Sequence, residues 1–364
     1  MLTRILFAAL LVVTASLNAA EKWRMQYYYD KDDSSISFVD IQCPSARRCV
    51  AAGVQEEGKH VKGVVVVTSD GGASWQIVEV KEHPVSLFFL NENKGWMVTD
   101  HGIWQTEETG RTWKKLKDEK DLQRVYFLDE SRGWAIGAPK LVLETKDAGR
   151  TWAPLDAAEK APTAPETTVY HWATFDGQRG VIIGAWTLPR NPRDLPDWMV
   201  PERARYRHQY PTVTILLQTA DGGKTWTQIS TSLEGTVTRF RYGAAGWGMA
   251  LFEYPNSSEL SSEVFKMDLG VKNTRVYGDK SRAIRDLALL SGGDVILAAI
   301  ERHGKSNDLP IPGKLKMMRS GSLETWIDMD VDYRAVATRA SIAAVDPRNV
   351  WVATDTGMIL KLTQ

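Results

Sequence analysis

The most regularly spaced acidic residues in the sequence are three aspartates, each set in a copy of one short phrase. The phrase reads TSDGGASW at 68–75, TKDAGRTW at 145–152 and TADGGKTW at 219–226. A looser copy, TEETGRTW at 106–113, has Glu108 in place of the aspartate. Carboxylates serve as acids, bases or nucleophiles, and glycoside hydrolases need two of them flanking a cleft. A catalytic role for the repeated carboxylate is therefore the first hypothesis to weigh.

The composition of the phrase favours a structural turn over catalysis. Asp accepts hydrogen bonds from the backbone of its own turn, Gly permits a positive φ, and the Ser or Thr hydroxyls can serve the remaining polar groups. The pattern Ser/Thr-x-Asp-x-Gly-x-Thr/Ser-Trp is that of the Asp-box, or BNR repeat, which is found in sialidases and several other propellers. We interpret as structural the residues Asp70, Gly72, Trp75, Glu108, Gly110, Trp113, Asp147, Gly149, Trp152, Asp221, Gly223 and Trp226.

The spacing of the phrase indicates a repeat architecture. Trp75, Trp113 and Trp152 lie 38 and 39 residues apart, which is the period of a four-stranded unit. Within each unit, short apolar runs with period-2 alternation are separated by turn residues. The sequence therefore predicts an all-β fold, a seven-bladed β-propeller of four-stranded antiparallel blades. Its innermost strands are expected near 35–42, 84–90, 122–128, 168–175, 236–242, 283–290 and 332–338.

The two ends of the chain are predicted to meet in the last blade. The final unit ends at Gln364 with three strands and no fourth, whereas the segment EKWRMQYYYD near the N-terminus has no partner of its own. We expect Trp23–Tyr29 to complete the last blade, which removes the exposed edges that an open ring would leave. Residues 21–364 are then one propeller domain.

The first twenty residues, MLTRILFAALLVVTASLNAA, read as a signal peptide at positions 1–20. Arg4 precedes an apolar core, and small residues follow at the expected cleavage point. The core is too short to span a bilayer, and no later stretch approaches the ~18 apolar residues of a transmembrane helix. We expect an exported protein in the periplasm, a lumen or the extracellular space. In such an oxidising compartment Cys43 and Cys49 are predicted to form a disulfide.

Charge and motif content exclude several classes of function. The chain has 45 Lys and Arg against 45 Asp and Glu, which argues against bulk nucleic-acid binding. The six histidines are dispersed without metal-ligand spacing, and no P-loop, dinucleotide glycine pattern or nucleophile elbow is present. The Arg-Ile-Pro motif of sialidases is also absent. We expect no catalytic residues, no metal and no cofactor.

Irregular loops point to the face of the propeller opposite the repeated phrase. Insertions fall between the second and third strands at about 186–211 in the fourth blade, 253–262 in the fifth and 301–315 in the sixth. Long loops on a rigid scaffold tend to carry function. Guanidinium groups suit carboxylate or phosphate recognition, and aromatic rings supply rigid contact area. The first loop supplies the binding candidates Trp198, Arg203, Arg205, Tyr206 and Arg207, which a solvated, proline-stiffened loop would also contain.

A second set of basic residues is predicted at the same face. Innermost strands start there, and five of them are expected to begin with a cation: Arg124, His171, Arg239, Arg285 and Arg334. Together these residues would ring the mouth of the central channel with positive charge. The alternative is an ordinary polar, water-filled channel, in which Asp286 and Asp332 offset part of the charge.

Two units have a specific resemblance to a known family. They read FLNENKGWMVTDHGIWQTEETGRTW at 89–113 and FLDESRGWAIGAPKLVLETKDAGRTW at 127–152. This arrangement resembles the photosystem II stability/assembly factor family of lumenal propellers and its bacterial relatives. The resemblance implies a non-catalytic scaffold that holds a membrane protein complex during assembly. We expect the protein to be a monomer. It also implies an arginine patch on one face, for which Arg124, Arg239, Arg285 and Arg334 are candidates by position.

A carbohydrate-active protein is the alternative function. A sialidase-like or other glycoside hydrolase, or a sugar-binding propeller, would use the same face. Trp186, Trp198 and Tyr206 could then stack on sugar rings. A pair of carboxylates across a cleft on that face would favour a hydrolase.

Overall fold

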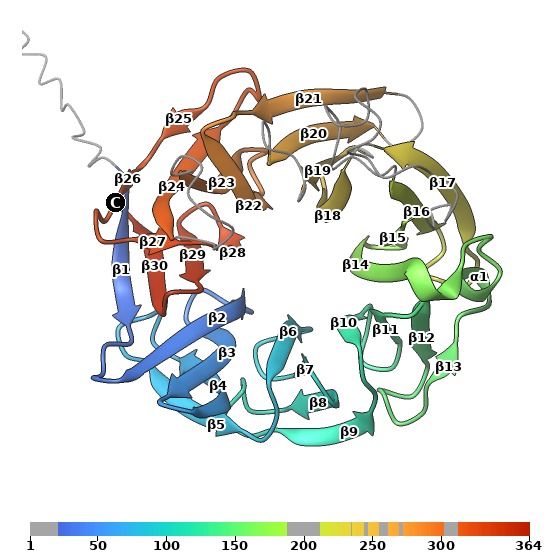
Figure 1. The fold of residues 1–364 in the computed structure, drawn as a ribbon, viewed down its shortest axis with the longest axis horizontal. Helices are drawn as coiled ribbons and strands as arrows, with labels where there is room; N and C mark the ends of the chain where they lie inside the picture. The colour runs from blue at the N-terminus through green and yellow to red at the C-terminus, as the bar shows by residue number, and fades with distance from the viewer. Residues whose placement is uncertain are drawn as a thin grey trace, which may run out of the picture.

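Seven antiparallel sheets stand around a central channel in the computed structural model, like the blades of a propeller (Figure 1). The structure describes residues 21–187, 212–233, 235–243, 247–254, 261–268, 272–301 and 312–364. Four strands in chain order run from the channel to the rim in each of the first six blades. The predicted seven-bladed propeller is therefore confirmed.

The strand bounds follow the predicted repeat closely through the first four blades. Blade one contains β2 (Ser34–Gln42), β3 (Cys49–Glu57), β4 (His60–Thr68) and β5 (Gln76–Val80). Blade two contains β6 (Pro84–Phe89), β7 (Gly95–Thr99), β8 (Gly102–Thr106) and β9 (Lys114–Asp118). Blade three contains β10 (Leu122–Phe127), β11 (Gly133–Gly137), β12 (Leu141–Thr145) and β13 (Ala153–Pro154). Blade four contains β14 (Thr168–Asp176), β15 (Arg179–Thr187), β16 (Thr212–Thr219) and β17 (Thr227–Leu233).

The remaining blades have the same arrangement, except that the outermost strand of blade seven comes from the N-terminal end of the described chain. Blade five contains β18 (Thr236–Tyr242), β19 (Trp247–Glu253), β20 (Ser262–Asp268) and β21 (Lys272–Gly278). Blade six contains β22 (Arg282–Leu289), β23 (Val295–Glu301), β24 (Gly313–Ser320) and β25 (Ile327–Asp328). Blade seven contains β28 (Ala340–Asp346), β29 (Asn349–Thr354), β30 (Met358–Thr363) and β1 (Lys22–Tyr28). Two short helices, α1 (Asp156–Glu159) and η1 (Pro165–Thr167), connect blades three and four.

One predicted innermost strand is misplaced. The segment 332–338 was expected to open blade seven, but the strand beside the channel is β28, which begins at Ala340. The preceding residues form β26 (Asp330–Val331), parallel to β1, and β27 (Val336–Ala337), antiparallel to the start of β24. They pair with the flanks of blades six and seven, so their apolar alternation does not reach the channel.

The apolar core of the described chain divides into seven clusters, one at each junction between neighbouring blades. The cluster between blades four and five, for example, joins Trp172 and Ile183 to Phe240 and Phe252. In the same way, Trp134 of blade three stacks on Phe175 of blade four with ring centroids 4.6 Å apart. Each blade thus buries both of its faces against neighbours, and burial of apolar surface is the main favourable term in folding.

The N-terminal strand closes the ring as predicted. β1 lies beside β30 at the rim of blade seven (Figure 1) and runs antiparallel to it. Trp23 is opposite Leu362, and Met25 is opposite Leu360. The indole of Trp23 is 1% exposed and packs in the cluster between blades six and seven. Its Nε1 donates a hydrogen bond to the Met329 sulfur at 3.3 Å. The last blade therefore has no unpaired rim edge along β30.

The repeated phrase forms the same turn between the third and fourth strands of blades one to four. In blade three, the Thr145 hydroxyl accepts a hydrogen bond from the Gly149 N–H at 2.9 Å. Asp147 accepts the Thr151 N–H at 2.8 Å and the Thr151 hydroxyl at 2.6 Å. Gly149 has a φ of +84°, which glycine adopts at little cost. Both carboxylate oxygens of Asp147 therefore accept hydrogen bonds from residues of its own turn.

The tryptophan of the phrase packs between blades. Trp226 donates its indole N–H to the Gly223 carbonyl at 3.0 Å and lies edge-on to Trp134 of the preceding blade, with centroids 5.7 Å apart. Trp113 and Trp152 make the equivalent hydrogen bonds to Gly110 and Gly149, each at 2.9 Å. The tryptophan is therefore held by the backbone of its own turn and fills the space between neighbouring sheets.

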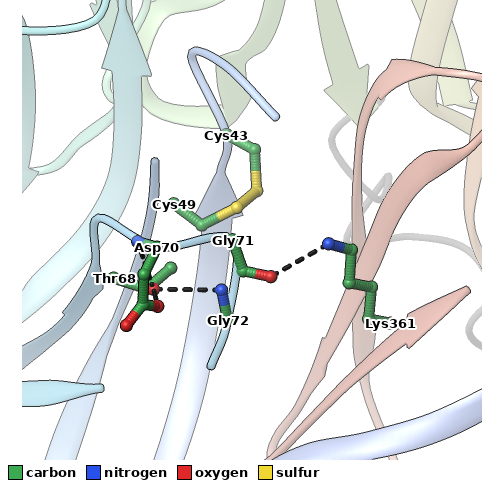
Figure 2. Close-up of a disulfide and its surroundings, with 7 residues drawn as sticks. All are labelled: Cys43, Cys49, Thr68, Asp70, Gly71, Gly72 and Lys361. Atoms are coloured by element: carbon green, nitrogen blue, oxygen red, sulfur yellow. Dashed lines mark hydrogen bonds between the residues drawn. A yellow bond between two sulfur atoms is a disulfide. The ribbon is translucent and has the colours of Figure 1, made fainter. Parts of the chain in front are cut away.

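A disulfide fixes the first of these turns next to the closing blade (Figure 2). The predicted bond between Cys43 and Cys49 is present. The Gly71 N–H donates to the carbonyl of Arg47 inside the disulfide loop at 2.8 Å. The Gly71 carbonyl accepts a hydrogen bond from Lys361 Nζ on β30 at 2.9 Å. Blades one and seven are therefore joined through this turn as well as through β1.

Replacing the two aligned carboxylates by alanine should separate their contributions to the turn. Asp147 receives a backbone N–H and two hydroxyls, whereas Glu108 receives the Thr112 hydroxyl and no N–H of Thr112. We expect Asp147→Ala to lower the melting temperature more than Glu108→Ala does, as measured by circular dichroism. Equal losses would contradict the inference that the two additional hydrogen bonds of Asp147 stabilise the turn.

The same turn should contribute to acid sensitivity. Hydrogen bonds from Thr151 lower the pKa of Asp147 from 3.8 to about 2. Because the pKa is lower in the folded protein, this stabilisation is complete above pH 3.8 and is lost as the pH falls toward about 2. Asp147→Asn should therefore lose less stability than the wild type over that pH window in unfolding titrations.

Ring closure should depend on Trp23 more than on the rest of its strand. Trp23→Ala removes a fully buried indole and should lower the free energy of unfolding by about 3–5 kcal/mol. The matched control is Tyr28→Ala on the same strand, because the Tyr28 side chain is 47% exposed. Denaturant titration checks both variants, and equal effects would show that Trp23 does not anchor the closure.

Candidate functional site

Six of the seven innermost strands carry a β-bulge before their final residues, and in most of the six it lies near the strand start. In β10, β14 and β18 one extra residue interrupts the register, between Leu122 and Arg124, Tyr170 and Trp172, and Val237 and Arg239. Bulges re-aim the side chains beside them. The same irregularity occurs in β2, β6 and β22. The residues that follow the six bulges are Asp40, Ser86, Arg124, Trp172, Arg239 and Asp286.

These strand starts line a cavity at one end of the channel. Its volume is about 730 Å³, and its lining includes Arg124, His171, Arg239, Arg285 and Arg339. We call this cavity the mouth. The start of β14 pairs with the end of β15, so the mouth lies at the end of the blades where second strands finish. The repeated turns follow the third strands at the opposite end. The predicted separation of the two faces therefore holds for the described residues.

Four of the five predicted cations line the mouth and one does not. Arg334 lies between β26 and β27, with its side chain 57% exposed and its Nη2 2.7 Å from the Asp332 carboxylate. Its predicted place at the start of an innermost strand is wrong, because that strand begins at Ala340. Arg339, directly before β28, lines the mouth instead. Asp332 likewise pairs with Arg334 and does not offset the charge at the mouth.

Three guanidinium groups gather around one indole ring at the inner side of the mouth, which we call its floor. Arg124 and Arg239 also line the cavity, whereas Trp172 and Arg241 lie behind its lining residues. The guanidinium carbons of Arg124, Arg239 and Arg241 lie 4.1, 4.9 and 4.7 Å from the Trp172 ring centroid. The Trp172 indole N–H donates to the Phe240 carbonyl at 3.0 Å, which fixes the ring. Cations are attracted to aromatic faces at such distances. We call these four residues the arginine cluster.

Two buried aspartates face the arginine cluster but belong mainly to the backbone. Asp40 accepts the N–H groups of Ile41 and Leu87, each at 2.9 Å, and therefore ties β2 to β6. Asp286 accepts the N–H groups of Leu287 and Ile342, each at 2.8 Å, and ties β22 to β28.

The ion pairs between these aspartates and the cluster are long. Asp40 lies 3.9 Å from Arg124 Nη2. Asp286 lies 3.5 Å from Arg239 Nε and 3.9 Å from Arg241 Nη2. Three cations therefore meet two carboxylates at distances beyond ordinary hydrogen bonds, and one positive charge is not balanced within the cluster.

Burial shapes the protonation of the groups around the floor. It lowers the pKa of Arg124 to about 10, an effect that Asp40 opposes and the neighbouring Arg239 and Arg241 reinforce. Burial also lowers the pKa of Arg241 and of His171. A pKa of about 10 keeps Arg124 charged at neutral pH, whereas burial favours the neutral form of His171.

The described lining of the mouth contains a single carboxylate. Glu253 Oε1 accepts a hydrogen bond from Arg285 Nη1 at 2.9 Å, so Arg285 is also partly neutralised. The three predicted insertions connect to this end of the ring. β15 ends at Thr187 and β16 begins at Thr212, so the first insertion is two residues shorter at its start than predicted. The candidates Trp198, Arg203, Arg205, Tyr206 and Arg207 lie outside the described residues.

Sequence reasoning missed three residues that build the floor and one at the rim: Trp172, Arg241, Asp40 and Arg339. Trp172 reads as a core residue of an apolar strand, and Arg241 lies two positions beyond an expected site residue. Their convergence depends on the bulges, and no residue type in the sequence predicts where a bulge occurs.

Among the described residues, no group of three His, Cys, Asp or Glu side chains could hold a metal ion. The helices of the described chain are too short or too polar to cross a membrane.

The comparisons with known proteins confirm the resemblance drawn from the repeat. The model of the family described as photosynthesis system II assembly factor YCF48 matches residues 67–175, which include Arg124. No curated protein matches the chain in sequence.

Solved structures share the fold at low sequence identity. A structure of YCF48 bound to a D1 peptide has a TM-score of 0.57 and 14% identity, covering 93% of this chain and 99% of that one. YCF48 from Cyanidioschyzon merolae has a TM-score of 0.57 and 14% identity over 94% and 98% of the two chains. The C-terminal WD40 domain of Sif2 has a TM-score of 0.52 and 8% identity over 95% and 99%. The shared feature is the propeller fold, which alone does not set function.

The aspartates at the floor should matter more for stability than the serine at the equivalent bulge position. Asp286→Ala leaves two buried N–H groups and two arginines without their partner, and should cost about 3–5 kcal/mol of unfolding free energy. Ser86→Ala is the matched control, because the buried Ser86 hydroxyl has no hydrogen-bond partner in the described chain. We expect Ser86→Ala to be nearly neutral in denaturant titration. Similar costs for both would contradict the role given to Asp286.

Proposed function

We propose that this chain is an exported, non-catalytic scaffold that binds a negatively charged segment of a membrane protein complex at the mouth. In this role it serves as an assembly or accessory factor of the kind that the family resemblance implies. The observation that carries the proposal is the basic mouth, which brings Arg124, Arg239, Arg285 and Arg339 together around one cavity.

The charge of the mouth supports recognition of an anionic segment. The arginine cluster has one unbalanced positive charge, and Arg339 at the rim has no ion pair within the described residues. Guanidinium groups bind carboxylates in a forked geometry that lysine cannot reproduce. A basic, concave surface also steers acidic partners during encounter. An acidic or carboxylate-rich segment therefore fits this face better than a neutral one.

The geometry supports binding more than hydrolysis. A glycoside hydrolase needs two carboxylates about 5–10 Å apart across its cleft. Glu253 is the one carboxylate among the described residues that line the mouth, and Arg285 holds it. Asp40 and Asp286 lie deeper and accept backbone hydrogen bonds. The carbohydrate alternative therefore has no carboxylate pair at the described mouth to support it.

Two further features fit the proposal. The leader-like residues 1–20 and the disulfide both suit an exported protein, since disulfides persist in oxidising compartments. The structure of YCF48 bound to a D1 peptide, which shares this fold with a TM-score of 0.57, is an example of such a propeller that binds a peptide. We extend the binding surface to the loop of blade four, whose candidates Arg203, Arg205 and Arg207 would add charge beside the mouth.

Site-specific photocrosslinking in the native envelope tests this function. A photoreactive residue at position 339 should form an adduct with a membrane protein. The same residue at position 146 should not, because Lys146 lies in the repeated turn on the opposite face, with its side chain 72% exposed. Arg203, Arg205 and Arg207 changed together to Glu should abolish the adduct without lowering the melting temperature.

Three outcomes would overturn parts of the proposal. Adducts at position 146 but not at 339 would move the binding surface to the other face. An unchanged adduct in the triple variant would remove the blade-four loop from the surface. Sugar release that depends on Glu253 would favour the carbohydrate alternative.

A further inference from the structure

The arginine cluster has hydrogen-bond donors that the protein does not satisfy. Arg124 carries five N–H donors, yet it makes no hydrogen bond within the described chain. Its contacts there are the Trp172 ring and the 3.9 Å approach to Asp40. The side chain is 16% exposed, so little bulk water reaches it. Donors of a largely buried charge that have no acceptor within the described chain are available to an anionic ligand.

The other two guanidiniums have similar spare capacity. Arg239 Nη1 donates to the carbonyl of its neighbour Thr238 at 2.9 Å, and Arg241 Nη1 approaches the Phe240 carbonyl at 3.5 Å. Their remaining donors have long-range contact with Asp286, whose oxygens already accept backbone N–H groups. The counter-charges are therefore occupied, and they cannot move closer without breaking the links between blades.

Trp172 holds the three cations together despite their mutual repulsion. Its ring lies within 5 Å of all three guanidinium carbons, and its own N–H is fixed to the Phe240 carbonyl. Arg124 comes from blade three, whereas Arg239 and Arg241 come from blade five. Arg124 and Arg239, which also line the mouth, can therefore approach one small ligand from two blades.

We propose that the arginine cluster binds a tetrahedral oxyanion of the phosphate class at the floor of the mouth. Such an anion offers three or four acceptor oxygens, so each guanidinium can form its own forked pair. A planar carboxylate offers two oxygens and leaves one guanidinium unpaired. The unbalanced positive charge of the cluster favours a charged ligand over water. This site goes beyond the proposed scaffold function and does not require a protein partner.

The ligand could be free phosphate or a phosphate monoester, and the cavity bears on the choice. Its volume of about 730 Å³ exceeds what one phosphate ion needs, and Arg124 and Arg239 are among its lining residues. An organic group attached to the phosphate would extend toward Arg285 and Arg339 at the rim. The two sources share the same contacts at the floor and differ only in what occupies the space above.

Isothermal titration calorimetry with the full mature chain tests the site. Inorganic phosphate is titrated in one arm and glycerol phosphate in the other, with chloride keeping the ionic strength constant. We expect one saturable site, with affinity for at least one of the two. A tighter fit for glycerol phosphate would identify a monoester site, and a tighter fit for inorganic phosphate a free-ion site. Absence of saturable binding in both arms would overturn the proposal.

Matched variants separate the cluster from general surface charge. Arg241→Gln should weaken binding by about tenfold or more, because it removes a charge-assisted hydrogen-bond donor. Arg334→Gln removes an exposed arginine on the outer side of the ring and should leave binding unchanged. Equal loss in both variants, or none in Arg241→Gln, would overturn the site assignment.

A second variant covers the case in which Arg241→Gln does not fold. Arg124→Lys keeps the charge but loses the forked donor geometry, and should also weaken binding. Melting curves without ligand establish that each variant is folded, and phosphate should raise the melting temperature of the wild type more than that of Arg124→Lys. Equal shifts would contradict the proposed geometry. Because no partner is present, failure here leaves the scaffold proposal standing.

Discussion

Closure of the ring is the constraint on which the rest of this molecule depends. The core of the described chain divides into clusters at the blade junctions, so no blade can bury its apolar faces alone. An open ring would expose the faces and strand edges of two blades at once. β1 prevents this by pairing with β30, and its Trp23 fills the junction between blades six and seven. The contacts of Gly71 with Arg47 and Lys361 brace the adjoining junction.

Because the blade faces are used for packing, polar chemistry is confined to strand ends and to the channel. The bulges at the starts of the innermost strands decide which side chains enter that space. Two of the positions they create hold aspartates that tie neighbouring blades together, and two hold arginines. Trp172 occupies another and gathers the cations against its ring. The bulges therefore position both the aspartates that link neighbouring blades and the arginines that make the mouth basic.

The architecture could be predicted from the sequence wherever nearby side chains determine the local fold. The phrase at 145–152 specifies a turn through its own side chains, and the period between its copies gives the blade length. The missing fourth strand of the last blade implied the pairing of Trp23. The prediction for Arg334 was wrong because the segment around 332–338 pairs with outer strands. The alternation of apolar residues does not distinguish a strand at the channel from one that pairs farther out.

The candidate site was predictable only in part for a related reason. Arg124, Arg239 and Arg285 follow from the strand starts, because their positions depend on the repeat alone. Trp172 and Arg241 converge through a bulge and a junction between blades, which are properties of pairing and not of residue type. The loop candidates of blade four depend on backbone that the repeat does not constrain.

The first and last strands of the described chain end on the face of the propeller opposite the mouth. β30 runs parallel to β28, away from the mouth, so Thr363 and its partner Lys22 lie at the end of blade seven that carries the repeated turns in other blades. A segment that joins the propeller before Lys22 or after Thr363 would therefore meet it on the face opposite the mouth. A propeller held by such a tether would keep its basic mouth turned outward, and the approach of a ligand or partner would be unobstructed by its own attachment.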